Sequence, residues 1–213
     1  MNRPFEKSLS EIYWERYKKF GSVPEGVFWL SESRQWLRFK LILDQLYKMN
    51  QSSVLDLADV GCGYGALISY LKSNKNTLGI RYTGYDVSQK LIGVCQRQFK
   101  EDWVQFRIGT SPSILTDYCV MSGTYNLAAT GDIFEWEKYV WGCLRKCWEN
   151  TSKAMIFNLQ VAEKAKITNN YIYYAEMALV LEKCVSLFGP TKIISHRQLP
   201  NDITFIVLKS YVD

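Results

Sequence analysis

Residues 59–65 of the chain read Asp-Val-Gly-Cys-Gly-Tyr-Gly, with three glycines at alternate positions after a run rich in apolar residues at 54–58. Glycine has no side chain, so it allows a tight turn and lets a ligand approach the backbone closely. The next segment, 64–74, has the apolar spacing of a helix. In open α/β sheets, ligands bind where a strand ends in such a turn and leads into a helix. This stretch therefore predicts both an α/β fold and its ligand-binding edge.

The rest of the chain alternates in the same way between short apolar runs and amphipathic stretches. Strands are predicted at 54–60, 82–87, 104–109, 125–130, 153–160, 192–197 and 203–209, and helices at 5–20, 33–49, 64–74, 88–99, 135–150 and 171–188. The connection at 198–202 (QLPND) has the length and residues of a hairpin turn. The pattern predicts a Rossmann-like, three-layer α/β/α sandwich. Its seven-stranded, mostly parallel sheet would end in an antiparallel C-terminal hairpin, with an N-terminal helical cap.

Composition limits the class of protein. The chain has 213 residues, 47% hydrophobic and 22% charged, which is typical of a soluble globular protein. We expect a helical cap at 1–50 and one compact unit at 51–213. No segment has the apolar length of a membrane span or of a signal peptide, so a cytoplasmic location without membrane attachment is expected. The oligomeric state stays open.

Charge and cysteine content narrow the set of partners. The net charge of +5 favours anionic partners only weakly, because the basic residues are dispersed. Nucleic acid is therefore a possible but less favoured partner. The six cysteines form no Cys-x-x-Cys pair and the one histidine is His196, so we expect no metal site and mostly buried, reduced thiols.

Two kinds of ligand suit the glycine turn. The spacing Gly61-x-Gly63-x-x-Ala66 also satisfies the dinucleotide pattern. A dinucleotide, however, would bring a pyrophosphate to the turn, and the carboxylate of Asp59 would repel it. The ammonium and sulfonium groups of S-adenosylmethionine are cations that the same carboxylate would attract. The sign of the charge favours S-adenosylmethionine.

The segments VGCGYG (60–65), YTGYDVSQKLIGVCQRQF (82–99) and YNLAATGDIF (125–134) resemble successive motifs of the class I S-adenosylmethionine-dependent methyltransferases, over roughly residues 50–210. The resemblance implies that the glycine turn, with Gly61, Cys62 and Gly63, wraps the methionyl part of the cofactor. It also implies that Asp86 binds both ribose hydroxyls. A carboxylate suits that role, because its two oxygens can accept two hydroxyl hydrogens. The alternative for Asp86 is a solvated strand-end aspartate that caps the helix at Ser88.

Other cofactor contacts follow from the same resemblance. Val87 would lie against the adenine. The family often has an acid after the third strand that meets the adenine amino group, but this chain has Thr110 and Ser111 there, so a hydroxyl or backbone group would replace it. Arg38, ahead of the glycine motif, is a candidate partner for the cofactor carboxylate; the alternative is an exposed helix arginine.

The acceptor side is expected in TGDIFEW (130–136), just after the predicted fourth strand. Thr130 is assigned to the cofactor there, and Asp132, Phe134 and Trp136 to the substrate, together with Trp29 in the connector between the first two helices. Catalysis would depend chiefly on holding the nucleophile in line with the methyl group and sulfur. Asp132 and His196 are the candidate bases if the acceptor needs deprotonation. For His196 the alternative is an ordinary strand histidine.

Three functions stay open. The first is an enzyme that transfers a methyl group from S-adenosylmethionine to an oxygen or nitrogen of a small molecule or peptide. The second is an RNA- or protein-directed methyltransferase, favoured if Lys183, Lys192 and Arg197 line the cofactor cleft. The third is a non-catalytic cofactor-binding protein or an NAD-dependent one.

Overall fold

The computed structural model of the protein describes residues 3–29, 31–74 and 79–209. As expected, the glycine-rich stretch separates the first strand from a helix. The chain forms two compact units, Met1–Thr110 and Ser111–Asp213. The two helices that the sequence assigns to a separate cap at 1–50 belong to the first of these units.

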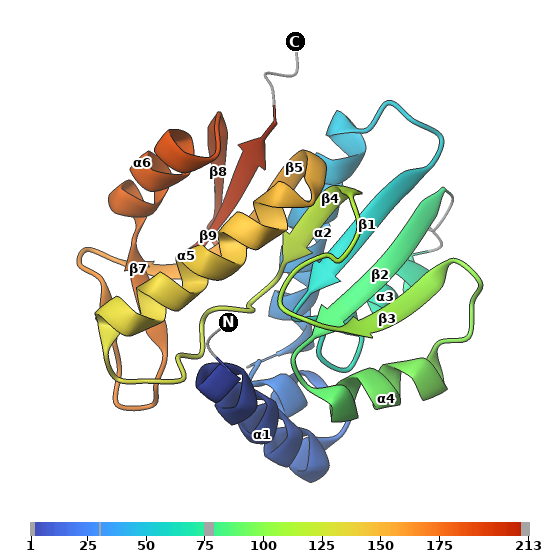
Figure 1. Cartoon of the computed structure of the whole chain (residues 1–213), viewed down its shortest axis with the longest axis horizontal. Coiled ribbons are helices and arrows are strands. Elements are labelled where there is room, and N and C mark those ends of the chain that lie inside the picture. Colours follow the sequence, from blue (N-terminus) through green and yellow to red (C-terminus); the bar gives the residue numbers. More distant parts are fainter. Residues whose placement is uncertain (1–2, 30, 75–78, 210–213) are drawn as a thin grey trace. The chain divides into compact units, whose positions relative to one another are not determined.

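The first unit contains three parallel strands, with β2 in the middle (Figure 1). They are β1 (Leu55–Val60), β2 (Ile80–Asp86) and β3 (Val104–Ile108). The helices are α1 (Arg3–Phe20), α2 (Glu32–Met49), α3 (Ala66–Ser73) and α4 (Gln89–Gln98), with the short 3-10 helix η1 (Pro24–Val27) after α1. Because all three strands are parallel, they end at one common edge, where the glycine turn and Asp86 lie.

Local sequence accounts for the boundaries of these helices. Ser31 and Ser88 precede α2 and α4, and each side-chain hydroxyl accepts a hydrogen bond from a backbone N–H in the first turn. Gly65 precedes α3 in the left-handed conformation. The apolar faces of α2 and α3 are buried, including Ile42, Leu46 and Ile68. The fold is thus fixed by caps at the helix starts and by burial of one face of each helix.

The second unit continues the α/β pattern and adds antiparallel strands. Its strands are β4 (Thr116–Met121), β5 (Thr151–Ala162), β6 (Lys166–Ile167), β7 (Tyr173–Glu176), β8 (Thr191–His196) and β9 (Leu199–Leu208), and its helices are α5 (Ile133–Glu149) and α6 (Met177–Leu187). β4 and β5 are parallel, whereas β9 is antiparallel to both β5 and β8. The predicted fold class, parallel strands flanked by helices with an antiparallel C-terminal hairpin, is confirmed.

Two predicted elements are wrong. Residues 125–130 form a loop instead of the fourth strand, which is β4 at Thr116–Met121. Residues 173–176 are not the start of a helix but strand β7, which pairs with β5 and β6. The hairpin between β8 and β9 is also tighter than QLPND suggested, since His196 pairs with Leu199. The described residues therefore contain nine strands instead of seven.

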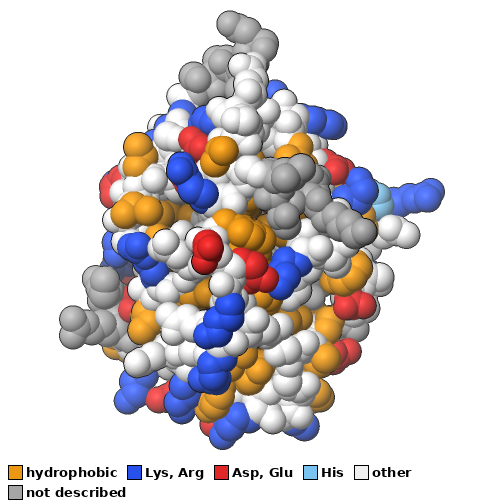
Figure 2. All heavy atoms as spheres, turned by 90° about the vertical axis from the view of Figure 1, so that its right-hand side faces the viewer, with side chains coloured by type: hydrophobic (Ala, Val, Ile, Leu, Met, Phe, Trp, Pro, Cys, Tyr) orange, Lys and Arg blue, Asp and Glu red, His pale blue; other side chains and the backbone are white. Residues whose placement is uncertain are grey.

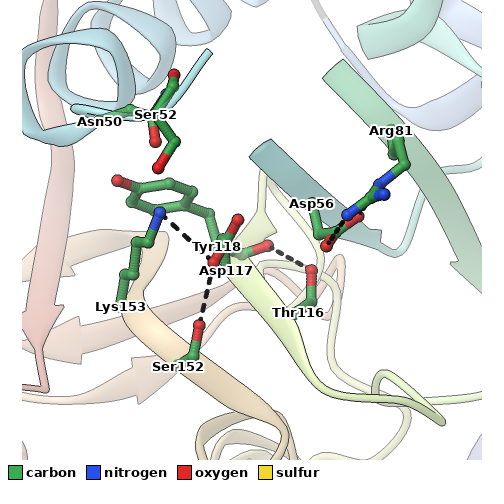
Figure 3. Close-up of polar contacts among 9 residues, drawn as sticks. All are labelled: Asn50, Ser52, Asp56, Arg81, Thr116, Asp117, Tyr118, Ser152 and Lys153. Carbon is green, nitrogen blue, oxygen red and sulfur yellow. Dashed lines mark hydrogen bonds and ion pairs between the residues drawn. The ribbon is translucent and has the colours of Figure 1, made fainter. Parts of the chain in front are cut away.

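Surface ion pairs join neighbouring strands within each unit. In the first unit, Arg81 on β2 donates two hydrogen bonds to Asp56 on β1, at 2.6 and 2.8 Å (Figure 3). In the second, Asp117 on β4 accepts a hydrogen bond from Ser152 Oγ at 3.2 Å and pairs with Lys153 Nζ at 3.4 Å. Exposed pairs of this kind contribute at most about 1 kcal/mol each. Asp56 thus serves the strand pairing, and Asp59 is the carboxylate nearer the ligand-binding edge.

All six cysteines are buried and unbridged, in agreement with the expected buried thiols. Among the described residues, no helix combines the length and the hydropathy that crossing a membrane would require. The same residues contain no cluster of three or more His, Cys, Asp or Glu side chains that could hold a metal ion.

Gly65→Ala should lower the free energy of unfolding by at least about 2 kcal/mol. Gly65 has a φ of +87°, and a Cβ there would lie 2.5 Å from the Phe99 ring. The left-handed conformation alone costs a non-glycine residue about 1–2 kcal/mol. Urea denaturation measures the change. Gly93→Ala in α4 is the control, because its Cβ would meet only Arg97 at 3.5 Å, and this change should raise stability by up to about 1 kcal/mol. Equal stability of the two variants would contradict the role of Gly65.

Candidate cofactor and acceptor sites

The glycine turn in the first unit has a backbone that only glycine adopts easily. Gly61, Gly63 and Gly65 all have positive φ, at +80°, +57° and +87°. The N–H groups of Gly61 and Cys62 both donate to the carbonyl oxygen of Tyr85 on β2, at 2.7 and 3.0 Å. The turn is therefore fastened to the end of β2, immediately before Asp86.

Asp86 connects this turn to helix α4. Its Oδ2 accepts a hydrogen bond from the Gly63 N–H at 2.9 Å, and its Oδ1 accepts one from the Ser88 N–H at 2.8 Å. The side chain is buried, and this burial raises the pKa of Asp86, while the backbone hydrogen bonds act in the opposite direction. The alternative interpretation of Asp86 as a solvated carboxylate beside Ser88 is thus correct about the contact with Ser88. It is wrong about exposure to solvent, because the side chain is buried.

Asp59, at the end of β1, is a second buried carboxylate in the same unit. It is only 3% exposed and accepts a hydrogen bond from the Tyr82 hydroxyl at 2.6 Å. Burial raises the pKa of Asp59 to about 7, the Tyr82 bond lowers it, and the charge of Asp86 raises it further. Two carboxylates that are costly to ionise therefore lie near the glycine turn, and a cation would stabilise their charged forms.

The segment between α1 and α2 covers the turn. A Cβ at Gly63 would lie 3.3 Å from Cγ1 of Val27 in η1. Arg38 on α2 is 3% exposed, and its guanidinium carbon lies 3.8 Å from the centre of the Trp29 ring. The alternative interpretation of Arg38 as an exposed helix arginine is wrong, because its guanidinium is stacked on an aromatic ring inside the unit.

Three other predicted cofactor residues belong to the first unit. Cys62 is buried, and the thiols of Cys62 and Cys95 are both directed to the carbonyl oxygen of Gly63, at 4.0 and 3.3 Å. Val87 and Thr110 are half-buried, one after β2 and one after β3. The structure thus brings Asp59, the glycines, Asp86 and Val87 to the common edge of the parallel strands.

In the second unit, the edge beyond β4 is held by a buried polar network. Asn158 on β5 donates to both carboxylate oxygens of Asp202 on β9, at 3.0 and 3.1 Å, and its own oxygen accepts the Gly123 N–H at 2.8 Å. Asn158 and Asp202 are both buried. Gly123 follows Ser122 at the carboxyl end of β4, so this network fixes the start of the loop that follows the strand.

The same loop is fastened again farther along. Oδ1 of Asn126 accepts the Gln160 N–H at 3.0 Å, and the Asn126 carbonyl accepts the Tyr173 N–H at 2.9 Å. Ala128 donates to the Tyr171 carbonyl at 2.8 Å. Asn126 therefore has a structural role, because it ties this loop to β5 and β7.

The predicted acceptor residues lie beyond this loop, at the start of α5. Asp132 is the N-cap of α5, and its Oδ1 accepts the N–H groups of Phe134 and Glu135 at 2.9 and 3.1 Å. Thr130 Oγ1 accepts the Asp132 N–H at 3.1 Å. Phe134 is 80% exposed, whereas Trp136 is fully buried. The segment thus contains one exposed aromatic ring and one core ring.

His196 and Ser111 are the remaining predicted site residues. His196 ends β8 and its Nδ1 accepts the Gln198 N–H at 3.2 Å. Because β9 runs antiparallel to β5 and Asp202 lies opposite Gln160, the β8–β9 turn lies at the edge where β5 ends. Among the described residues, no hydrogen bond joins His196 to Asp132. Ser111, the first residue of this unit, is half-buried.

Sequence reasoning missed several residues at these sites. Tyr82 lies within β2 and its hydroxyl donates to Asp59, Ser122 directly follows β4, and Asn158 and Asp202 form the network behind Gly123. A polar residue inside an apolar strand, such as Asn158 in 153–160, is the signal that could have indicated this network, because a buried amide has to be hydrogen-bonded.

Comparison with known proteins agrees with this arrangement. Residues 58–152 match the model of the family described as "Methyltransferase domain". This match agrees with the resemblance to the class I S-adenosylmethionine-dependent methyltransferases. The matched residues include the glycine turn, Asp86 and the loop after β4.

A curated relative and solved structures extend the likeness beyond that segment. The protein named "Putative methyltransferase Rv1506c" from Mycobacterium tuberculosis is 25% identical over 166 residues, which are 76% of this chain and 98% of that protein. Magnesium protoporphyrin IX methyltransferase from Synechocystis PCC 6803, solved with bound SAH, superposes with a TM-score of 0.65 at 11% identity over 96% of this chain and 98% of that one. A SAM-dependent methyltransferase from Leishmania major gives 0.69 at 11% identity over 94% and 82%. These structures share the fold.

Asp59→Asn should flatten the dependence of stability on pH between about pH 5 and 7. The pKa of Asp59 is raised from 3.8 to about 7 in the folded protein, so in this range the folded state keeps a proton that the unfolded state has lost. Raising the pH then favours unfolding, by at most about 1.4 kcal/mol per pH unit. Asparagine can still accept the Tyr82 hydrogen bond. Urea denaturation at pH 5, 6, 7 and 8 measures the difference, and parallel curves for the two proteins would refute it.

Proposed function

We propose that the protein transfers a methyl group from S-adenosylmethionine to a nucleophilic oxygen or nitrogen of a small molecule or peptide. The observation that carries this proposal is the pair of buried carboxylates, Asp59 and Asp86. They lie on either side of a glycine turn, and a ligand can come close to the N–H and Cα groups of that turn. A pyrophosphate would meet negative charge there, whereas a ligand with a cationic end and a ribose meets suitable partners. NAD is the less favoured ligand for this reason.

Asp86 would hold the ribose of the cofactor. The carboxylate already accepts backbone hydrogen bonds from Gly63 and Ser88 and interacts with the Val87 N–H. Since a carboxylate has about four acceptor positions, capacity for at least one ribose hydroxyl is left. Ligand hydroxyls would also offset the cost of ionising the buried group. Val87, the next residue, would lie against the adenine.

The methionyl end would be held by charge. Asp59 would attract the ammonium group, and the buried guanidinium of Arg38 would pair with the carboxylate. Gly61, Cys62 and Gly63 would offer bare backbone between them. Thr110 and Ser111 are the proposed hydroxyl or backbone partners of the adenine amino group.

When bound, S-adenosylmethionine supplies a methyl group on a positively charged sulfur. The protein's contribution would be to hold the acceptor in line with the methyl–sulfur bond and to exclude water. Candidate acceptor contacts are Trp29, Asp132 and Phe134, with His196 as a second candidate base. Thr130 stays a candidate cofactor contact, and the predicted substrate role of Trp136 is not kept because its ring is fully buried. Since β4 ends at Met121, Ser122 and Gly123 are closer in sequence to the strand end than any of these and join the candidates.

A small acceptor is favoured over RNA by the distribution of charge. On the face displayed in Figure 2, Lys and Arg side chains lie among acidic, hydrophobic and neutral ones. Lys183, one of the residues whose clustering would favour RNA, lies 4.4 Å above the Trp141 ring of its own unit. Dispersed basic residues give a weak electrostatic footprint for a nucleic acid.

Cofactor binding can be tested by titration calorimetry with S-adenosylmethionine, S-adenosylhomocysteine and NAD. We expect the first two to bind and NAD not to bind. Asp86→Ala should weaken binding of S-adenosylhomocysteine at least about 100-fold, because it removes two hydrogen bonds to a charged group of about 1.5–3 kcal/mol each. Asp56→Ala, which loses a surface carboxylate, is the control. Tighter binding of NAD than of S-adenosylhomocysteine would reject the proposal.

Asp132→Asn separates a catalytic role of Asp132 from its role as a helix cap. Asparagine caps a helix about as well as aspartate, so the melting temperature and the affinity for S-adenosylmethionine should stay the same. If the carboxylate is a base, turnover with a competent acceptor should fall, and the defect should shrink as the pH rises. The measurement is release of S-adenosylhomocysteine across pH 6 to 9. Full activity at every pH would leave the cap as its only role.

A further inference from the structure

A cavity of about 310 Å³ lies between helices α2 and α3 of the first unit. Its lining comes from one face of α2, from the last turn of α3 and from the residue that caps α3: Lys40, Leu43, Asp44, Tyr47, Tyr70, Leu71 and Asn74. The α2 residues recur at spacings of three and four positions, which place side chains on the same face of a helix. Small-molecule sites begin at about 300 Å³, so the cavity has room for one small ring compound.

The cavity is separate from the cofactor edge. Helix α3 starts directly after Gly65 of the glycine turn, ends at Ser73 and is capped by Asn74. A helix of this length spans about 12 Å, so Asn74 lies one helix length away from the turn. The lining residues include no candidate for the cofactor or the acceptor, and a molecule bound here would therefore be an additional ligand.

The floor of the cavity is apolar and its walls are aromatic. Leu43 and Leu71 are buried, whereas Tyr47 and Tyr70 are half-buried. The Tyr70 ring is held by the Trp36 ring, which meets it edge to face at 5.4 Å. A ring fixed in this way loses little conformational freedom when a ligand binds, and aromatic pairs contribute more than the area that they bury. The cavity therefore favours a flat ring over a flexible chain.

The charges at the rim of the cavity are balanced. Lys40 Nζ and Asp44 Oδ2 form an ion pair at 2.6 Å, and their side chains are 60% and 42% exposed. A charged ligand would have to compete with one member of this pair for the other, whereas an uncharged ligand leaves the pair intact. The exposed amide of Asn74 adds a further polar group. The rim thus suits a carboxamide or a hydroxyl group, which both donates and accepts hydrogen bonds.

We propose that this cavity binds a small, flat, uncharged ring compound with one polar substituent, such as an aromatic carboxamide or a phenol. The ring would lie against Tyr47 and Tyr70 above the two leucines, and the substituent would meet the polar groups of the rim. The inference goes beyond the proposed function and does not depend on it, because no lining residue has a part in methyl transfer.

Four probes of similar size separate the effect of shape from that of charge. They are benzamide, cyclohexanecarboxamide, benzoate and benzylammonium, and ligand-detected NMR with the whole chain gives their dissociation constants. We expect benzamide to bind with a constant on the order of 1 mM, as small ligands of good efficiency do. The other three should bind at least about threefold more weakly. Saturating S-adenosylhomocysteine should not displace benzamide.

Two variants connect binding to the cavity. Tyr47→Leu removes one wall and should weaken benzamide binding about three- to tenfold. Asp44→Asn leaves the ammonium of Lys40 without its carboxylate, so benzoate should bind about two- to fivefold more tightly. The matched control is Glu15→Gln, which removes the carboxylate of another exposed ion pair in the same unit, with Lys18 at 2.7 Å. It should leave all four constants unchanged.

The opposite results would overturn the proposal. If the wild type does not bind benzamide, or binds it no more tightly than benzoate, the cavity is not a site for an uncharged ring. Displacement of benzamide by S-adenosylhomocysteine would assign the probe to the cofactor edge. An unchanged benzamide affinity in Tyr47→Leu, or an unchanged benzoate affinity in Asp44→Asn, would place the probe elsewhere. Because Asp44 is partly exposed, its variant keeps the test valid if Tyr47→Leu lowers the melting temperature.

Discussion

The carboxylate of Asp86 joins the two backbone segments from which the cofactor edge of the first unit is built. One oxygen accepts the N–H of Gly63 in the glycine turn, and the other accepts the N–H of Ser88 before α4. These N–H groups come from segments that follow different strands, so this side chain joins them in addition to the hydrogen bonds from Gly61 and Cys62 to the Tyr85 carbonyl. Because a buried carboxylate is tolerated only when it is hydrogen-bonded, the same contacts that shape the turn also keep the charge where a ribose would need it.

Electrostatic cost and ligand chemistry are linked at this edge. Burial raises the pKa values of both Asp59 and Asp86 above their ordinary range. A protein selected for stability alone would gain by replacing such groups with apolar ones. Their presence beside a turn made of bare backbone indicates that the cost is offset by something that binds there. A ligand that carries a positive charge and hydroxyl donors offsets it, and an anionic ligand would increase it.

The elements that local sequence determines could be predicted, and those that depend on distant partners could not. The first three strands, the glycine turn and Asp86 follow from apolar runs, glycine spacing and the serine before α4. Residues 125–130 have Tyr125 and Leu127 at alternate positions, as a strand has, but they form a loop whose hydrogen bonds go to β5 and to Tyr171 and Tyr173. β7 runs into α6 without a glycine or proline between them, and its pairing with β5 and β6 alone makes it a strand. The burial of Arg38 could not be predicted locally, because it depends on Trp29 in a separate segment.

The corrected position of β4 changes which residues can determine the acceptor. Placing the strand at Thr116–Met121 makes Ser122 and Gly123 the first residues beyond it and moves Asp132 to the far end of a loop. That loop is fixed at Gly123 by Asn158 and at Asn126 by the backbone of Gln160. Its shape therefore depends on β5 and, through Asp202, on β9. Acceptor preference in this chain would then be set by a backbone held from three separate strands.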